Sequence, residues 1–532
     1  MTPLSRRNWM MTLGGGVIAS TNLEAGTQLG AAASNETFHL GTRRELFVDA
    51  QLIDRMVGQA RRQLQRPQRT DDVFVHDTPW EGNRTLYYTL FADGERYRMY
   101  YRGSQINLSQ GKYSIPYNVT CYAESTDGRS WTRPNLGLVN FDGSKNNNII
   151  LSGEQCHAFV PFKDPNPRCT AERRYKAIVP IYKPTRGLHV YASADGIRWS
   201  PMSQKAVITT GYFDSQNLAF WDARRKLYVV YFRALRGGPN RIQPESHEMS
   251  TKDVMVATSP DFLDWSRPRW LRYSEERWST FGTQSKTTSP YLQLYTNQIQ
   301  PYARAPHLYV GFPTRYAAGR GELQGLNQQL GSSVPYFGNA YTDGGLMVSR
   351  DGERFEFWDE AFFRPGAEAN NGWVYGDNFQ ALGLLETPVS RGHVAAADQP
   401  PERELSLYVN EGFWRQCRLR RYRLRLDGFV SATAPLAGGE VITKPFHFEG
   451  RQLELNLSTS AVGSVRVEIQ DATGTPLPKY ALEECLPIFG DRVSRVVRWK
   501  RAEGVRELAT QPIRLRFVIR DADLFSFRFG SV

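Results

Sequence analysis

The sequence has few cysteines and no long apolar run. Its 532 residues include five cysteines, and none of them stands in a CxxC or Cys/His pattern. A zinc site and a redox motif are therefore not indicated, and we expect buried free thiols. No segment approaches the roughly 20 apolar residues that cross a membrane, so no membrane partner is expected.

Helical periodicity is also scarce. Long runs rich in Ala, Leu, Glu and Lys are missing, whereas aromatic residues make up 12% of the chain. Aromatic residues favour strands, which predicts an all-β fold. A chain of this length exceeds one ordinary core, so two domains are expected.

The chain has no block of charge of one sign, although its formal net charge is +12. Basic residues alternate with acidic ones, and no nucleic-acid motif appears. We therefore expect a solvated basic surface and no nucleic-acid partner. Mild attraction to an anionic polymer is the alternative.

The N-terminal segment is a candidate export signal. "SRRNWMMTLGGGVIAS" places Arg6 and Arg7 ahead of an aromatic residue and a weakly apolar, glycine-rich run. This pattern predicts a twin-arginine signal peptide over residues 1–33 and a periplasmic or extracellular protein. A basic start followed by a disordered tail is the alternative.

A short turn motif, S-x-D-G-x-x-W, recurs along the chain. Its four copies are "STDGRSW" (125–131), "SADGIRW" (193–199), "SPDFLDW" (259–265) and "SRDGERF" (349–355). In such a turn Asp caps the backbone, Gly supplies a positive φ and the aromatic residue packs back. A strand-like run precedes each copy, so the motif marks a repeated β unit.

Strand–turn–strand segments alternate with these motifs and define five units, which begin near residues 75, 156, 211, 293 and 373. Radial repetition of short strands is typical of a propeller. The sequence therefore predicts a five-bladed β-propeller over residues 40–430. Beyond it, strict alternation such as Leu453, Leu455 and Leu457 predicts a C-terminal β-sandwich over residues 431–532, as an accessory domain.

Polar residues stand ahead of each predicted inner strand. The five leading segments are "HDTPWEGN", "HAFVPFKDPNP", "YFDSQN", "LYTNQIQPY" and "WVYGDNFQ". Four of them carry carboxylates, at Asp77 and Glu81, Asp164, Asp214, and Asp377, and the fourth offers Asn297 and Gln298 instead. Each acid could also shape a turn, but acids that fall in register favour a shared site in the channel.

These features resemble the five-bladed glycoside hydrolases related to families 32 and 43. The segments "ELFVDAQLID", "STDGRSWTRPNLGL", "FDSQNLAFWD" and "AGGEVITKPFHFEG" look like bacterial proteins of a family 32-like group. The resemblance implies a nucleophile or base from the first blade, an orienting Asp from the second and a general acid from the third.

Carried over by position, "KDPNP" makes Asp164 the counterpart of the second-blade Asp-Pro element. Asp214 falls in the third blade, where the family has Glu. The first-blade Asp-Pro motif is missing, so Asp77 and Glu81 both stay open for that role.

The resulting prediction is an exported glycosidase with catalytic Asp164, Asp214, Glu81 and Asp377, and with no metal ion or other cofactor. The predicted carbohydrate-binding residues are Asp77, Trp80, Gln216, Asn217, Asn297, Tyr302, Arg315 and Trp373. A non-catalytic carbohydrate-binding propeller and a polysaccharide lyase or sialidase-like enzyme are the alternatives. The oligomeric state stays open.

Overall fold

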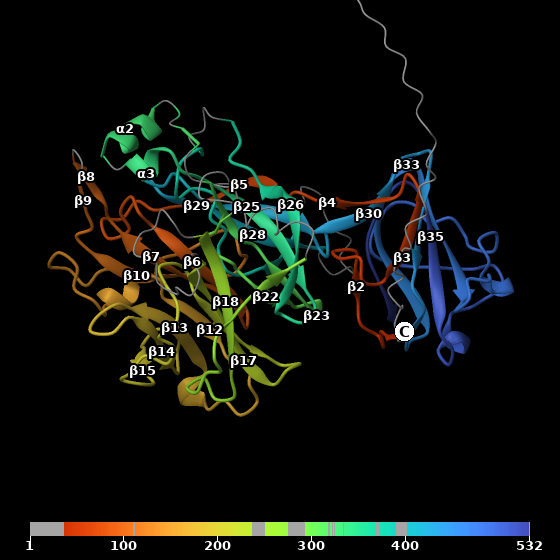
Figure 1. Ribbon diagram of the computed structural model, residues 1–532, viewed down its shortest axis with the longest axis horizontal. Helices are drawn as coiled ribbons and strands as arrows, with labels where there is room; N and C mark the ends of the chain where they lie inside the picture. Colours follow the sequence, from red (N-terminus) through yellow and green to blue (C-terminus); the bar gives the residue numbers. More distant parts are fainter. Residues whose placement is uncertain are drawn as a thin grey trace, which may run out of the picture. The chain divides into compact units, whose positions relative to one another are not determined.

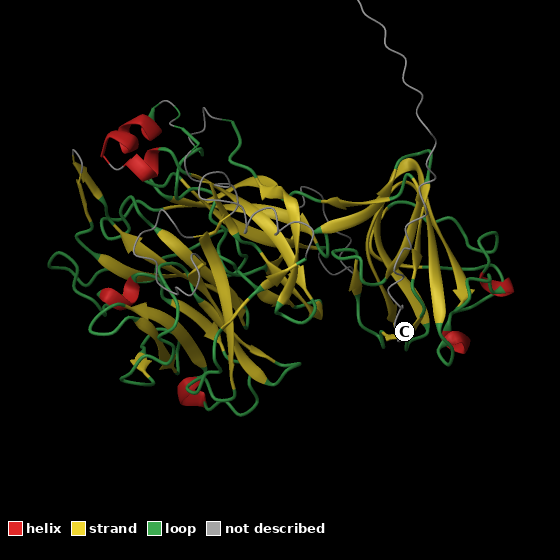
Figure 2. Ribbon diagram, viewed as in Figure 1, coloured by secondary structure: helices red, strands yellow, loops and turns green. Residues whose placement is uncertain are grey.

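The computed structural model describes residues 37–109, 112–236, 251–274, 293–317, 320–321, 323, 325–333, 335–367, 372–389 and 402–530. The predicted signal peptide lies outside these residues. Strands dominate the described chain (Figure 2), and its α-helices are the short α2 (Leu326–Ser333) and α3 (Pro335–Gly338). The all-β expectation is confirmed. Within the described ranges, no helix has the length and apolar character needed to cross a membrane.

Four sheets consist of four antiparallel strands each (Figure 1). The first contains β6 (Leu86–Asp93), β7 (Arg96–Ser104), β10 (Asn118–Ser125) and β11 (Ile149–Ser152). The second contains β12 (Val160–Lys163), β13 (Tyr175–Ile181), β14 (Gly187–Ser193) and β15 (Ser200–Pro201). The third contains β16 (Leu218–Asp222), β17 (Leu227–Arg236), β18 (Thr251–Ser259) and β19 (Arg269–Trp270). The fifth contains β27 (Leu385–Pro388), β28 (Arg403–Glu411), β29 (Arg418–Arg425) and β5 (Gln68–Val75).

The fourth unit departs from this form. It lies in a seven-stranded sheet of β20 (Arg272–Tyr273), β26 (Arg354–Phe363), β25 (Tyr341–Ser349), β23 (Ala305–Gly311), β22 (Gln300–Tyr302), β21 (Gln293–Leu294) and β24 (Thr314–Ala317). The predicted five-bladed propeller is thus corrected to a propeller-like arrangement of four four-stranded blades, with the fourth unit in a larger sheet. Pro313 has no N–H for the ladder, and it separates β23 from β24, which pair with different parts of β25.

The arrangement is propeller-like because first strands of neighbouring four-stranded sheets contact one another, in the pairs β27–β6, β6–β12 and β12–β16. Thr89 in β6 forms a parallel bridge with Leu382, just ahead of β27. Residues that precede the first strands therefore share one face, which we call the leading face. Residues that follow them share the opposite, trailing face.

The turn motifs join neighbouring units. In the first copy, Ser125 Oγ accepts a hydrogen bond from Gly128 N at 2.9 Å, and Asp127 Oδ1 accepts one from Arg129 N at 2.7 Å. The glycine carbonyl then accepts a tyrosine hydroxyl from the preceding unit. These pairs are Tyr408–Gly128, Tyr100–Gly196 and Tyr231–Gly352.

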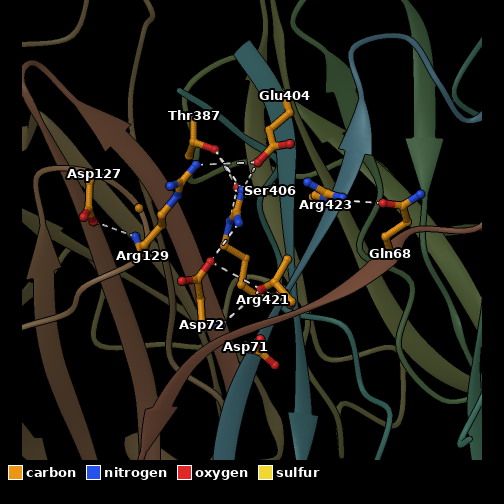
Figure 3. A network of polar contacts seen from close by, with 12 residues as sticks. Gln68, Asp71, Asp72, Asp127, Arg129, Thr387, Glu404, Ser406, Arg421 and Arg423 are labelled. Atoms are coloured by element: carbon orange, nitrogen blue, oxygen red, sulfur yellow. Dashed lines mark hydrogen bonds and ion pairs between the residues drawn. The ribbon is translucent and has the colours of Figure 1, made fainter. Parts of the chain in front are cut away.

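The fifth sheet closes the arrangement, because its outer strand β5 comes from the N-terminal side of the first unit. Buried Arg421 on β29 connects the strands of this sheet (Figure 3). Its guanidinium donates to Asp72 of β5 at 2.8 Å, to Ser406 of β28 at 2.7 Å, and to Glu404.

A further, ten-stranded sheet is built from both ends of the described chain. Its strands are β1 (Phe38–His39), β2 (Glu45–Leu46), β3 (Ile53–Gly58), β4 (Arg61–Leu64), β30 (Val430–Ala434), β31 (Gly439–Thr443), β32 (Phe446–His447), β33 (Gln452–Asp471), β34 (Asp491–Val496) and β35 (Ile513–Gly530). The alternating Leu453, Leu455 and Leu457 are fully buried in its core. Because β3 and β4 pair with β31 and β30, the segment 40–64 belongs to this sheet and not to the predicted propeller.

The hairpin of β8 (Asn107–Ser109) and β9 (Lys112–Ser114) completes the named strands. Short 3-10 turns occur at Glu154–Cys156, Ala171–Arg173, Pro478–Tyr480 and Arg506–Leu508. All five cysteines are free, and four of them are buried as expected, whereas Cys169 is partly exposed.

Candidate functional site

Asp164 lies on the trailing face, because it follows the four-residue strand β12. Its carboxylate forms an ion pair with Lys176 and accepts a hydrogen bond from Tyr228 at 2.7 Å. The strand is roughly 13 Å long at about 3.3 Å per residue, and it separates Asp164 from the leading residues. The predicted place of Asp164 in the channel site is therefore corrected.

The register of such acids has a structural cause. Three units end their first strand, or follow it directly, with an Asp that accepts a tyrosine hydroxyl from the next unit. These pairs are Asp93–Tyr175, Asp164–Tyr228 and Asp222–Tyr309. The repeated acids on this face thus hold neighbouring sheets together, which is why they recur at matching positions.

Glu81 is completely buried in an ion-pair network. Its carboxylate contacts His76 at 3.1 Å, Tyr101 at 2.6 Å and Arg133 at 2.9 Å. Burial opposes ionisation, but His76 and Arg133 hold the pKa of Glu81 well below its usual range. Both carboxylate oxygens of Glu81 have hydrogen-bond partners and its side chain is not exposed, so its role is structural.

The other first-unit candidates also have local partners. Asp77 is exposed and lies 3.5 Å from Arg133. Trp80 donates its indole N–H to Asn148 at 2.7 Å and packs edge-on against Phe141. Neither residue is brought against Asp214.

Asp377 lies ahead of β27 but is almost fully buried. Its carboxylate accepts a hydrogen bond from the backbone N–H of Phe413 at 2.8 Å. Burial raises the pKa of Asp377 well above its usual range.

The axis of the propeller-like region is closed by amides. Gln298 donates to Gln216 Oε1 and to the carbonyl of Gln380, each at 2.7 Å. Gln216 donates to Tyr88 O at 2.9 Å. Gln216 therefore lies in the packed centre and not on an open surface.

Most remaining predicted binding residues stabilise the backbone or a neighbouring sheet. The side-chain oxygen of Asn217 accepts a hydrogen bond from the backbone N–H of Arg233 at 3.0 Å, and that of Asn297 accepts one from the backbone N–H of Ile299 at 3.2 Å. Tyr302 donates to Asp427 at 2.8 Å. The last two interactions of this kind are Arg315–Asp343 at 2.5 Å and Trp373–Gly366 O at 2.9 Å.

Asp214 lies on the leading face and, unlike Asp377, remains accessible. It precedes β16, and 36% of its side chain is exposed. His157, which precedes β12, places Nε2 at 3.2 Å from Asp214 Oδ1. Arg233 near the end of β17 places Nη1 at 3.9 Å from Asp214 Oδ2.

The backbone ahead of β16 explains how Asp214 reaches this face. Phe213 has a φ of 62° and a fully buried ring, which turns the next residue away from the core. Tyr87 has the same φ of 62° in the first unit. A positive φ at such bulky residues is strained, and strain of this kind clusters at functional sites.

Charge keeps Asp214 ionised. Burial opposes its ionisation, yet the contact with His157 and the charge of Arg233 hold the pKa of Asp214 well below its usual range. Burial lowers the pKa of His157, and the contact with Asp214 offsets only part of this decrease. The pair at pH 7 is therefore a carboxylate beside a neutral imidazole.

Three further basic side chains belong to this cluster. Burial, and to a smaller extent the charges of Arg102 and Arg84, lower the pKa of His157. Burial and then the charge of Arg233 lower the pKa of Lys252 to about 7, and the charge of Asp214 offsets only part of this decrease. Tyrosine rings pack beside them. We call the whole set the Asp214 site: Arg84, Tyr87, Arg102, His157, Tyr182, Tyr212, Asp214, Arg233, Lys252, Tyr295 and Tyr316.

The sequence reasoning missed most of this set, although two signals were present. His157 precedes β12 by three residues, as Asp214 precedes β16 by four, so equivalent leading positions indicate His157 and not Asp164. The strand endings "YYR" (100–102) and "YFR" (231–233) repeat an Arg that lies close to the leading face in both units.

Among the described residues, no three His, Cys, Asp or Glu side chains gather in a way that could hold a metal ion.

Comparison with known proteins found no matching family model and no matching curated protein. Among solved structures, the chain is similar to a protein titled glycoside hydrolase, with 12% identity, a TM-score of 0.40 and coverage of 67% of this chain and 92% of the other. It is also similar to a family 43 arabinoxylan arabinofuranohydrolase from Bacillus subtilis, with 12% identity, a TM-score of 0.37 and coverage of 85% and 96%.

A third similar structure is a family 32 β-fructofuranosidase from Bombyx mori, with 9% identity, a TM-score of 0.36 and coverage of 88% and 94%. At these identities and TM-scores, the activity has to be argued from the residues of the site.

Proposed function

We propose that the protein is a glycosidase and that the Asp214 site is its active site. The observation that carries this proposal is the accessible carboxylate of Asp214, held ionised beside His157 and Arg233 on the face where the first strands begin. Cleavage of a glycosidic bond needs a carboxylate that acts as nucleophile or base beside the anomeric carbon and a general acid that protonates the leaving oxygen. Asp214 fits the first of these two roles. The rings of Tyr182 and Tyr212 beside Asp214 can pack against a sugar face.

The charge of Asp214 suits that role. A base or nucleophile must be deprotonated before the reaction. His157 and Arg233 keep Asp214 deprotonated at neutral pH. Asp164 and Glu81 are bound in other ion pairs, so the two-carboxylate arrangement expected from the resemblance gains no support from them.

A polysaccharide lyase is the second candidate, and a specific observation favours it. His157 is neutral and lies beside Asp214 and the arginines. A lyase needs such a neutral base to remove a proton next to a carboxylate that cationic groups neutralise.

The test is a screen of the purified protein on plant and algal glycans. Wild type should release new reducing ends, and Asp214→Asn should lose at least about 100-fold of the rate. Asp71→Asn, an exposed acid on β5, should keep full activity. Products with an ultraviolet-absorbing double bond would identify a lyase, and glycan binding without any cleavage would refute both enzymatic proposals.

We also propose that the ten-stranded sheet folds over its core as an accessory β-sandwich.

We further propose that residues 1–33 direct export by the twin-arginine route. Replacement of Arg6 and Arg7 by Lys should retain the protein in the cytoplasm. Cell fractionation and immunoblotting measure the export. Unchanged export of the variant would refute the proposal of a twin-arginine signal.

A further inference from the structure

The Asp214 site carries an excess of positive charge. Its basic side chains are Arg84, Arg102, Arg233 and Lys252, and Asp214 is the one carboxylate in the set defined above. A neutral saccharide would add no negative charge to balance these groups. This excess of positive charge therefore favours a substrate that carries negative charge.

Two of the arginines are buried with unused donors. Arg102 is 3% exposed and Arg233 is 2% exposed, and the Nε of each has no hydrogen-bond partner. The remaining donors of Arg102 reach only backbone carbonyls, those of His157 at 3.3 Å and Arg84 at 3.1 Å. A buried charged donor without an acceptor is costly unless a ligand satisfies it.

Tyrosine rings fix the positions of these cations. The guanidinium of Arg233 lies 4.4 Å from the ring centroid of Tyr295, and that of Arg102 lies 4.7 Å from Tyr87. Lys252 Nζ lies 4.1 Å from the ring centroid of Tyr316. Cations stacked on aromatic faces lose little freedom when an anion binds.

We propose that the Asp214 site binds a saccharide that carries an oxyanion, and that Arg102 and Arg233 recognise this group as the carboxylate of a uronic acid residue. This inference rests on the proposed function, since it names the substrate class of the same site. Planar guanidinium groups match a planar carboxylate through paired hydrogen bonds. A sulfate ester offers similar oxygens, and the experiment separates these two sources.

The experiment measures binding by titration calorimetry with the full-length Asp214→Asn protein, so that no substrate is consumed. The probes are an oligogalacturonide, the same oligomer with its carboxyl groups reduced to alcohols, and a sulfated neutral oligosaccharide of equal length. The uronate oligomer should bind at least about tenfold more tightly than its reduced form, the gain expected for charged hydrogen bonds.

Two variants test the assigned arginines in the same background. Arg102→Met and Arg233→Met should each weaken uronate binding at least about tenfold, while binding of the reduced oligomer should change little. The control is Arg198→Met, whose side chain is 73% exposed in a surface pair, and it should bind as its parent does. Circular dichroism checks that every variant is folded.

Equal binding of the uronate and reduced oligomers would overturn the inference while leaving a glycosidase for neutral sugars intact. Preference for the sulfated probe would overturn the carboxylate assignment. Tight uronate binding by a wild-type protein that cleaves no glycan would support the anionic ligand and refute the proposed function.

Discussion

At the scale of single residues, chemical type and sequence neighbourhood say little about role until the partners are known. Asp164 and Asp214 both adjoin the first strand of a unit. Asp164 forms an ion pair with Lys176, whereas Asp214 contacts neutral His157 and stays 36% exposed. Accessibility and the identity of the partner separate the structural acid from the candidate catalytic one.

Lys252 should make anion binding depend on pH. Burial, and then the charge of Arg233, lowers its pKa to about 7, and Asp214 only partly offsets this. Asp214 stays ionised and the arginines stay charged near pH 7, while Tyr295 and Tyr316 face the ammonium. Lys252 is charged below pH 7 and neutral above it, so uronate affinity should fall as pH rises through about 7.

The measurement is the dissociation constant of the uronate oligomer across that range, for wild type and Lys252→Met. The variant should show a flatter profile. An identical profile in both proteins would show that another group titrates.

At the scale of elements, acid–tyrosine pairs between sheets add to the apolar contacts that also join neighbouring sheets. Asp164→Asn should destabilise the fold by about 3–5 kcal/mol, because buried Lys176 loses its charge partner. Tyr228→Phe removes one hydrogen bond to the same carboxylate and should cost about 1 kcal/mol. Urea unfolding measures both.

Both variants should keep the specific activity of wild type, because Asp164 lies on the face opposite Asp214. Loss of activity in a folded Asp164→Asn protein would show that Asp164 contributes to the active site.

Glu81 connects the segment before the first strand to Arg133. Glu81→Gln should lower the free energy of unfolding by about 3–5 kcal/mol at pH 7. The pKa of Glu81 in the fold lies below its unfolded value, so its contribution is present above the unfolded pKa and is lost as pH falls through the folded pKa. The stability difference between wild type and variant should therefore shrink in strong acid.

Urea titrations at neutral and acidic pH test this dependence, with exposed Glu95→Gln as the control. A difference that grows in acid would contradict the assigned ion pair.

At the scale of the whole propeller-like region, closure depends on β5, a strand supplied from the N-terminal side. Arg421→Met removes the group that joins β5 to β28 (Figure 3). It should destabilise the protein by about 3–5 kcal/mol, since Glu404 loses its buried partner. Hydrogen exchange of residues 68–75 should accelerate more than that of β6.

Arg423→Met provides the matched control, because Arg423 lies on the same strand, is exposed and contacts only Gln68 among the groups drawn in Figure 3. Equal exchange of β5 in both variants would argue against closure through Arg421.

The repeated local patterns were readable without the structure. The S-x-D-G-x-x-W turns, the alternating Leu453, Leu455 and Leu457 and the wealth of aromatic residues predict an all-β chain with repeated units. Such features depend on contacts within a few residues or on the two-residue period of a strand. Asp214 was found in the same way, by its place ahead of a strand.

The partners of each acid, the extra strands of the fourth unit and the pairing of β3 and β4 with β31 and β30 were decided only by the tertiary structure. These interactions join residues far apart in the chain: Tyr228 reaches Asp164 across 64 positions, and β5 pairs with β29 across more than 340. A local pattern can mark Arg233 and His157 as repeated features. The pairing of β17 with β16 brings Arg233 to the carboxylate of Asp214, and the packing of the neighbouring sheet brings His157 there. Neither contact can be read from sequence spacing, because both depend on which strands lie side by side.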